Sequence, residues 1–289
     1  MAGLRRLLES IAAQRGTPPF EVIVVDNDRH ASAREIAGSF TGSLNLRYAV
    51  EPERGLSPVR NHTVKLARAD CLVFVDDDEV VPPTWLAALH RGLAGSASVA
   101  AAFGPVKVVF EDGVREEIRR CRFFARPHPP EGAAIPWYFT YTANTCVKKS
   151  ALPDPLAPFR PQFGKTGGED VDLFKRIADA GGTFVAAGTD AGVKEFRERK
   201  RADLAWTLRR SLRNGGNLAD LEWSGLRRRE RRKLAGETFA TALRCGIEAM
   251  KQRRRDRLRF VELCIDATEN AGRALSVLGY RYPEYASRR

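Results

Sequence analysis

A short apolar run that ends in four acids constrains the fold of this chain more than any other stretch. Residues 72–75 (LVFV) contain no polar side chain, and residues 76–79 (DDDE) follow directly. An apolar run of this length without alternation predicts a strand buried on both faces, as in a parallel sheet. Open α/β sheets bind ligands beyond the carboxyl ends of their strands, so these acids fall where a ligand would lie.

The clustered acids also indicate a cation. The carboxylates of Asp76, Asp77 and Asp78 repel one another, and a hard divalent ion such as Mg²⁺ or Mn²⁺ would relieve that repulsion. Such an ion could in turn neutralise a diphosphate. A solvated acidic turn after a strand is the alternative for these residues.

Strand and helix patterns alternate through the first two-thirds of the chain, which predicts a doubly wound α/β domain. The expected strands are residues 20–25, 46–50, 71–75, 99–110 with an interruption at residues 104–105, 143–148 and 183–187. The expected helices are residues 4–15, 32–40, 58–69 and 84–93, one that begins near residue 170, and further helices after residue 203. Ser57 is expected to cap the third helix, with Pro58 at its first position.

Composition separates the chain into two parts. Residues 1–194 hold 24 Lys and Arg against 23 Asp and Glu, a net charge of +1, whereas residues 195–289 hold 24 against 13, a net charge of +11. The basic part favours an anionic partner. The five scattered cysteines indicate reduced thiols in the cytoplasm. No apolar run is long enough to span a bilayer, and no signal peptide is expected.

Three other short segments bear candidate polar groups. A second apolar strand ends at Asp26, whose carboxylate could accept hydrogen bonds from a base or a ribose, although a strand-to-loop turn is the alternative. Arg60 lies near a helix start, where anions bind; a solvated arginine is the alternative. Glu169 and Asp170 follow a Gly-Gly loop and could supply a general base, or could serve only to cap a helix.

Taken in order, these pieces resemble the inverting family 2 glycosyltransferases with a GT-A fold. The matching motifs are VDND, GLSPVRN, FVDDDE, TANTCV and GGEDVDLF. The resemblance in order and spacing covers residues 1 to about 213. The resemblance implies a Rossmann-like mixed sheet flanked by helices, with residues 1–200 as the transferase domain and residues 201–289 as a basic helical extension. GKTGGEDVDLF and RADLAW resemble bacterial exopolysaccharide enzymes of the succinoglycan glucosyltransferase type.

The resemblance also implies roles for individual residues. Asp170 would be the catalytic base with Glu169 beside it, and Asp78 with Asp76 would hold the Mg²⁺ or Mn²⁺ ion. The donor, UDP-glucose, would be bound by Asp26, Asp28, Arg60, Asn61, Asp76, Asp77 and Asn144. The acceptor would be a glycan or a polyprenyl-diphosphate-linked oligosaccharide.

Two departures from the family pattern stand out. Family members begin with an additional strand before the helix that starts here near Leu4, so the sheet is expected to lack that first strand and part of the nucleotide pocket. Relatives often carry a histidine where this chain has Lys194, and a protonated ammonium cannot ligate a metal.

The basic blocks at residues 227–233 and 253–257 flank a helical pattern. They favour a peripheral site on an anionic inner membrane surface, with a solvated bundle face as the alternative. Nucleic acid is a weaker partner because no reading motif accompanies the charge. Two other functions remain open: a catalytically impaired transferase-like protein that acts as a basic membrane- or nucleic-acid-binding module, and a nucleotidyltransferase.

Overall fold

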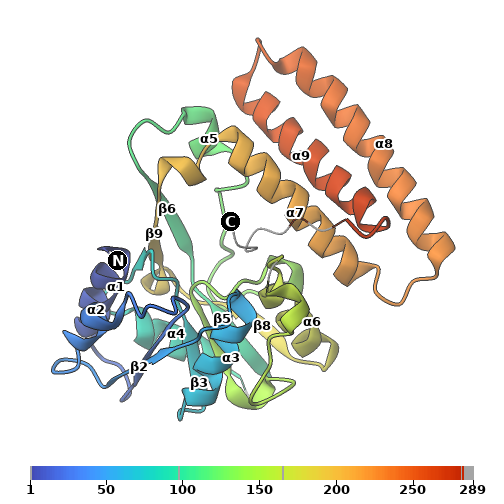
Figure 1. Cartoon of the computed structure of the whole chain (residues 1–289). Helices are drawn as coiled ribbons and strands as arrows, with labels where there is room; N and C mark the ends of the chain where they lie inside the picture. The colour runs from blue at the N-terminus through green and yellow to red at the C-terminus, as the bar shows by residue number, and fades with distance from the viewer. Residues whose placement is uncertain (1, 97, 165, 281, 283–289) are drawn as a thin grey trace. The chain divides into compact units, whose positions relative to one another are not determined.

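The computed structural model describes residues 2–96, 98–164, 166–280 and 282. The chain forms two compact units, whose elements are labelled in Figure 1. The first unit comprises Met1–Lys107 and Pro127–Phe196, and the second comprises Val108–Arg126 and Arg197–Arg289. A segment from the middle of the chain therefore belongs with the C-terminal helices.

The strands of the first unit form separate sheets. β1 and β2 pair in parallel, with Val22 opposite Leu46 and Asp26 opposite Val50. A four-stranded mixed sheet has the order β3-β7-β5-β8, in which β7 is antiparallel to both β3 and β5, and β5 is parallel to β8. The strands are β1 (Val22–Asp26), β2 (Leu46–Val50), β3 (Cys71–Phe74), β4 (Glu79–Val80), β5 (Val99–Phe103), β6 (Val106–Phe110), β7 (Thr145–Lys148), β8 (Thr183–Ala186) and β9 (Val193–Arg197).

An apolar slot lies between β1 and β3. Within the described residues β1 pairs only with β2, and β3 pairs only with β7, so each strand has one open edge. The slot has a volume of about 330 Å³ and is lined by both strands, including Val22 and Ile23 from β1 and Leu72, Val73 and Phe74 from β3. We refer to it below as the β1–β3 slot.

Helices cover the sheets because each presents an apolar stripe. In α1, Leu4, Leu7, Leu8 and Ile11 recur at helical spacing, and all four are buried. Phe103 of β5 and Phe174 of α6 are fully buried with their rings 5.0 Å apart. The helices of the first unit are α1 (Ala2–Ala12), α2 (Arg34–Gly38), α3 (Leu56–Leu66), α4 (Trp85–Ala94) and α6 (Glu169–Asp179), with short 3-10 helices at Trp137–Phe139, Lys149–Ala151, Pro161–Phe163 and Thr189–Ala191.

The second unit is helical. Its elements are α5 (Glu116–Arg120), a 3-10 turn at Arg199–Arg201, α7 (Leu204–Glu222), α8 (Arg228–Gln252) and α9 (Arg257–Ser276). α7 and α9 approach so closely that a Cβ on Gly215 would lie 1.9 Å from the Glu269 carbonyl oxygen, and one on Gly272 would lie 1.9 Å from that of Leu212. Among the described helices, none combines the length and the apolar character that crossing a bilayer requires.

Most predicted elements of the first unit are confirmed within a few residues, but two details are wrong. Ser57 does not cap α3; Gly55 does, at a φ of 131° that disfavours other residues, and Ser57 lies inside the helix. The strand at residues 71–74 is only partly buried, because one of its edges faces the β1–β3 slot. At its other edge it pairs antiparallel with β7, so the expected parallel neighbours are absent from the described residues. The weak pattern after residue 111 concealed α5, and β4, with two residues, was too short to predict. The five-residue β9 was missed.

Candidate active site

The end of β1 is organised by Asp26. Its Oδ2 accepts hydrogen bonds from the Ala33 N–H and the Tyr48 hydroxyl, both at 2.8 Å, and its Oδ1 accepts the Asp28 N–H at 2.9 Å. Burial of the phenol, followed by its bond to Asp26, raises the pKa of Tyr48 to about 12. The carboxylate therefore shapes the loop after β1, and any contact with a base would add to that task.

Asn27 joins this loop to the start of α3. Its amide donates to the carbonyl oxygens of Glu51 and Glu53 at 2.8 and 2.7 Å, and its Oδ1 accepts the Gly55 N–H at 3.1 Å. A Cβ on Gly55 would lie 2.8 Å from the Gly164 carbonyl oxygen, so only glycine fits there. The β1 loop, the α3 start and the loop before α6 are thereby linked in series.

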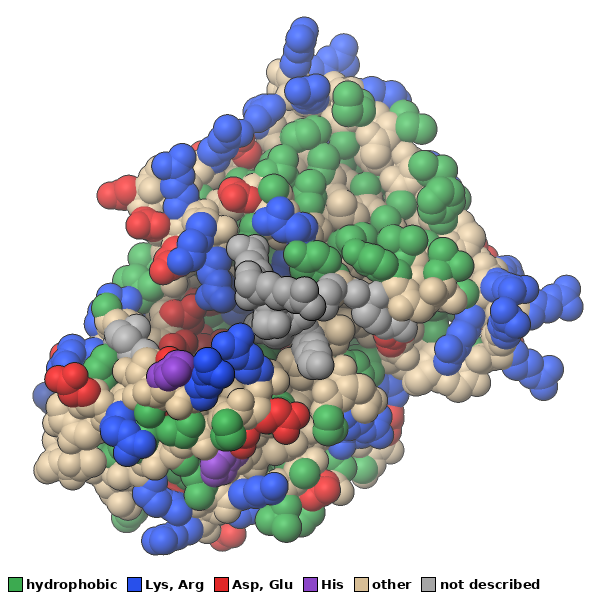
Figure 2. Space-filling view, viewed as in Figure 1, with side chains coloured by type: hydrophobic (Ala, Val, Ile, Leu, Met, Phe, Trp, Pro, Cys, Tyr) green, Lys and Arg blue, Asp and Glu red, His purple; other side chains and the backbone are tan. Residues whose placement is uncertain are grey.

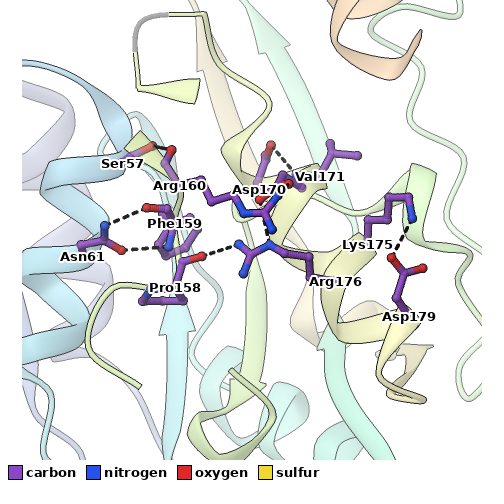
Figure 3. A network of polar contacts seen from close by, with 11 residues as sticks. Ser57, Asn61, Pro158, Phe159, Arg160, Asp170, Val171, Lys175, Arg176 and Asp179 are labelled. Atoms are coloured by element: carbon purple, nitrogen blue, oxygen red, sulfur yellow. Dashed lines mark hydrogen bonds and ion pairs between the residues drawn. The ribbon is translucent and has the colours of Figure 1, made fainter. Parts of the chain in front are cut away.

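The inner side of α3 holds the segment Pro158–Arg160 (Figure 3). The side-chain amide of Asn61 donates to the Phe159 carbonyl at 2.8 Å and accepts the Phe159 N–H at 2.9 Å, while the Ser57 hydroxyl donates to the Arg160 carbonyl at 2.9 Å. Both ends of the Asn61 amide are thus engaged with the main chain. These contacts give Asn61 a positioning task, and its predicted contact with a nucleotide stays a prediction.

A buried ion pair connects α3 to α6. The Arg60 guanidinium pairs with the Glu169 carboxylate, and their side chains are only 15% and 2% exposed. The guanidinium also lies 5.7 Å from the centre of the Phe159 ring. Because burying an ion pair is favourable only with close geometry, this pair fixes where α6 begins relative to α3.

Asp170 differs from its neighbour Glu169. Glu169 is buried and engaged with Arg60, whereas Asp170 is partly exposed, and in the described part of the chain its carboxylate accepts only the Val171 N–H, at 2.8 Å. Gly168 precedes α6 with a φ of 91°, which turns the chain sharply into the helix. Of the two predicted catalytic acids, Asp170 is therefore the more accessible, and its role as the base stays a prediction.

The first turns of α6 are held by a network that sequence reasoning missed. Asp172, 2% exposed, accepts from Arg176 at 2.9 Å and from Arg160 at 3.2 Å. Arg176 also donates to the Pro158 carbonyl, which ties α6 to the segment held by α3 (Figure 3). The four-residue spacing of Asp172 and Arg176 was the available signal, since residues so spaced share a helix face.

The acids after β3 lie in a turn. Asp76 and Asp77 are exposed, Asp78 is partly buried, and the Asp76 N–H donates to the buried Glu79 carboxylate at 3.0 Å. β4 follows and pairs with β9, which sets the exposed Lys194 opposite Val80. The ammonium therefore belongs to the strand beside this acidic turn.

The turn offers oxygen ligands but no complete metal cage. Among the described residues, no three His, Cys, Asp or Glu side chains are grouped so as to hold a metal ion. Mg²⁺, however, is commonly held by one or two carboxylates together with substrate phosphates and water. Asp76 and Asp78 offer oxygen atoms of the kind that such a cation prefers, and their role as its ligands stays a prediction.

Asn144 is fully buried and has a φ of 59°. Its Oδ1 accepts the Trp85 indole N–H at 2.7 Å, and its amide donates to the carbonyl oxygens of Pro105 and Ala191 at 2.9 and 2.8 Å. Every polar atom of this side chain therefore serves the protein interior. The predicted place of Asn144 near the donor sugar or the acceptor stays a prediction.

The predicted residues thus fall into two sets, apart from the buried Asn144. The loop after β1, the start of α3 and the start of α6 are connected through Asn27, Gly55 and the Arg60–Glu169 pair. The acidic turn after β3 is separate: in the described part of the chain, no hydrogen bond or ion pair joins Asp26 or Asp170 to Asp76 or Asp77.

Comparison with known proteins identifies the family. Residues 2–153 match the protein family described as "Glycosyl transferase family 2". The chain belongs to this family. The succinoglycan biosynthesis protein ExoM of Rhizobium meliloti (strain 1021) is 32% identical over 240 residues, which cover 81% of this chain and 76% of ExoM. A validoxylamine A glucosyltransferase of Streptomyces hygroscopicus subsp. limoneus is 24% identical, over 68% of this chain and 49% of its own length.

Solved structures support the same fold. S. aureus TarS 1-349 in complex with UDP matches with a TM-score of 0.55 at 15% identity, over 96% of this chain and 88% of that chain. The same protein in complex with UDP-GlcNAc matches with a TM-score of 0.56 at 16% identity, over 90% and 86%. The family 2 transferase described here therefore has a mixed α/β fold of the GT-A type, followed by α7–α9.

Proposed function

We propose that the chain is an inverting transferase that moves glucose from UDP-glucose to a glycan or a lipid-linked oligosaccharide in exopolysaccharide synthesis. Its similarity to ExoM and to a glucosyltransferase supports glucose and exopolysaccharide, and the UDP and UDP-GlcNAc bound to TarS support a UDP-sugar. The observation that carries the proposal is the contrast at the start of α6, where Glu169 is buried with Arg60 and Asp170 stays accessible.

In this proposal Asp170 removes the proton from the acceptor hydroxyl. The acceptor oxygen then attacks the anomeric carbon on the face opposite the diphosphate, the bond from that carbon to the UDP oxygen breaks, and the configuration inverts. The Arg60–Glu169 pair and the contacts of Asn61 hold the helix that carries Asp170. Asp26 and Asp28 are assigned to the nucleotide, and Asp77 to the donor.

Asp76 and Asp78 would hold Mg²⁺ or Mn²⁺ on the diphosphate. That ion supplies charge neutralisation of the leaving group when it is bound. The exposed Lys194, on the strand beside the acidic turn, is the residue that could contact the diphosphate directly. Residues 1–200 are assigned to the transferase reaction and residues 201–289 to attachment at the inner face of the plasma membrane, next to a lipid-linked acceptor.

Thermal unfolding tests the donor and the ion together. UDP-glucose with Mn²⁺, each at about 100 times its dissociation constant, should stabilise the protein by about 2.7 kcal/mol, a melting shift of about 5–10 °C. Asp78→Ala should remove the shift, and Asp190→Ala, a change at an exposed acid elsewhere in the first unit, should keep it. Asp170→Asn should keep the shift yet release no UDP. The donor assignment fails if no UDP-sugar shifts the melting temperature, and the catalytic assignment fails if Asp170→Asn turns over normally.

A further inference from the structure

Helix α8 exposes an apolar stripe to solvent. Phe239, Leu243, Ile247 and Met250 are 55%, 54%, 63% and 63% exposed. Their spacings of four, four and three residues place them on one helix face. We call these four side chains the α8 stripe. Figure 2 shows apolar side chains gathered over this helix, with Lys and Arg side chains at its two ends.

The stripe is not the face that holds the helical unit together. The buried residues of α8 are Ala242 and Ala249, on the side that lies against α9. A third side of α8 is polar and carries ion pairs between Lys233 and Glu237 and between Lys251 and Glu248. The helix thus has a packed side, a polar side and an apolar side for which the bundle has no use, and an exposed apolar patch of this kind marks an interaction surface.

Positive charge brackets the stripe at both ends. Residues 227–233 contain six Lys and Arg against one Glu, and residues 251–257 contain five against one Asp. Arg228 and Arg232 precede Phe239 by eleven and seven residues, spacings that put them on the face of the stripe. The two basic ends are 18 residues apart on α8, from Lys233 to Lys251, a length of about 27 Å at 1.5 Å per residue.

A hollow adjoins the N-terminal end of the stripe. It has a volume of about 790 Å³, and its walls combine apolar residues, among them Trp223, Leu226 and Phe239, with the arginines Arg228 and Arg232. Apolar walls with guanidinium groups suit an amphiphile whose headgroup is a phosphate, because guanidinium pairs with phosphate through paired hydrogen bonds.

We propose that this face of α8 docks on an anionic phospholipid bilayer, with the α8 stripe in the acyl region and the arginines at the headgroup phosphates. The inference names the surface used in the membrane attachment proposed above and rests on that attachment, not on the sugar chemistry. A second copy fits the face poorly, because pairing two α8 helices in either direction brings basic ends together. Nucleic acid would use the arginines and offer a base to Phe239, but it would leave Leu243, Ile247 and Met250 without apolar partners.

Vesicle binding of the full chain tests the proposal. Vesicles of phosphatidylglycerol and phosphatidylcholine (30:70) should sediment the protein, and pure phosphatidylcholine vesicles should not. Leu243→Gln with Ile247→Gln removes apolar area without changing charge and should weaken partitioning about 30- to 100-fold. The matched control is Glu237→Gln with Arg244→Gln, which makes two changes on the polar side, leaves the net charge unaltered and should retain binding. Arg228→Gln with Arg232→Gln should weaken binding at least about tenfold.

Three outcomes would overturn the proposal. Equal loss in the polar-side control would mean that α8 acts through folding, which circular dichroism of each variant checks. If the arginine changes weaken binding but the Leu243 and Ile247 changes do not, the surface is purely electrostatic, such as one for nucleic acid. Self-association that only the Leu243 and Ile247 changes abolish, seen by sedimentation velocity, would assign the face to a second copy. UDP-glucose binding is measured separately, so a chain that binds vesicles but no nucleotide would refute the proposed function and keep this inference.

Discussion

Replacing Arg60 by methionine should locally destabilise the junction of α3 and α6. Glu169 is 2% exposed, so Arg60→Met removes an ion-pair partner from a buried carboxylate. Breaking a buried pair in this way costs about 3–5 kcal/mol. The lower figure corresponds to about a 150-fold change in a local opening equilibrium, because each 1.4 kcal/mol is a factor of ten.

Hydrogen exchange followed by mass spectrometry reads this equilibrium in peptides that cover α3 and α6. Arg60→Met should accelerate exchange there by about 100-fold or more, while α7–α9 should remain unchanged. The double change Arg60→Met with Glu169→Met should recover much of the protection, because apolar side chains of similar volume replace a buried ion pair at little cost.

A more exposed ion pair on α6, Lys175 with Asp179, provides the control. Lys175 and Asp179 lie 2.7 Å apart, but the aspartate is 60% exposed, so Lys175→Met should cost less than about 1 kcal/mol and alter exchange less than about fivefold. Equal effects at Arg60 and Lys175 would refute the reasoning. The reasoning would also be refuted if the protection lost in the double variant equalled the sum of the losses in Arg60→Met and in Glu169→Met alone.

Two further predictions follow from single contacts. The pKa of Tyr48 is about 12 in the folded protein, above its ordinary value of 10. The stabilisation from this hydroxyl is therefore complete below pH 10 and is lost as the pH rises toward 12. Urea titrations at pH 9 and pH 11.5 should show that Tyr48→Phe reduces this loss of unfolding free energy by about 1 kcal/mol. Gly272→Ala puts a Cβ 1.9 Å from the Leu212 carbonyl oxygen and should cost about 2–4 kcal/mol of unfolding free energy. Gly236→Ala on α8, where a Cβ would have nothing within 4 Å, should be neutral or stabilising. Similar urea unfolding midpoints for the two variants would contradict the close α7–α9 crossing.

The sequence predicts the first unit well where apolar periodicity is strong. The alternation of residues 46–50 gives β2 with the bounds observed, and the spacing of Leu4, Leu7 and Leu8 gives the buried face of α1. Pairing partners are another matter. An apolar run such as residues 71–74 is compatible with parallel or antiparallel neighbours, and only the tertiary structure supplies β7 on one side and an open edge on the other.

The candidate site divides along similar lines. The sequence identifies Asp170 as an acid at a helix start, because two glycines followed by two acids are a local pattern typical of the first turn of a helix. The tasks of Asn61 and Asn144 had no such signature, since their partners are carbonyl and amide groups 39 to 98 residues away along the chain. Long-range main-chain contacts leave little trace in composition or periodicity, so polar residues that hold loops resemble polar residues that bind ligands.

The β1–β3 slot divides the first unit mechanically. A continuous sheet opens as one cooperative block, whereas in the described residues no backbone ladder joins β1 and β2 to β3, β7, β5 and β8, and the two parts are coupled through side-chain packing in a shared core. The facing borders of β1 and β3 also offer main-chain groups to any extended segment of a neighbouring molecule. At high concentration, strand exchange between molecules should therefore start at these edges. The helices α7, α8 and α9 should stay folded during that exchange.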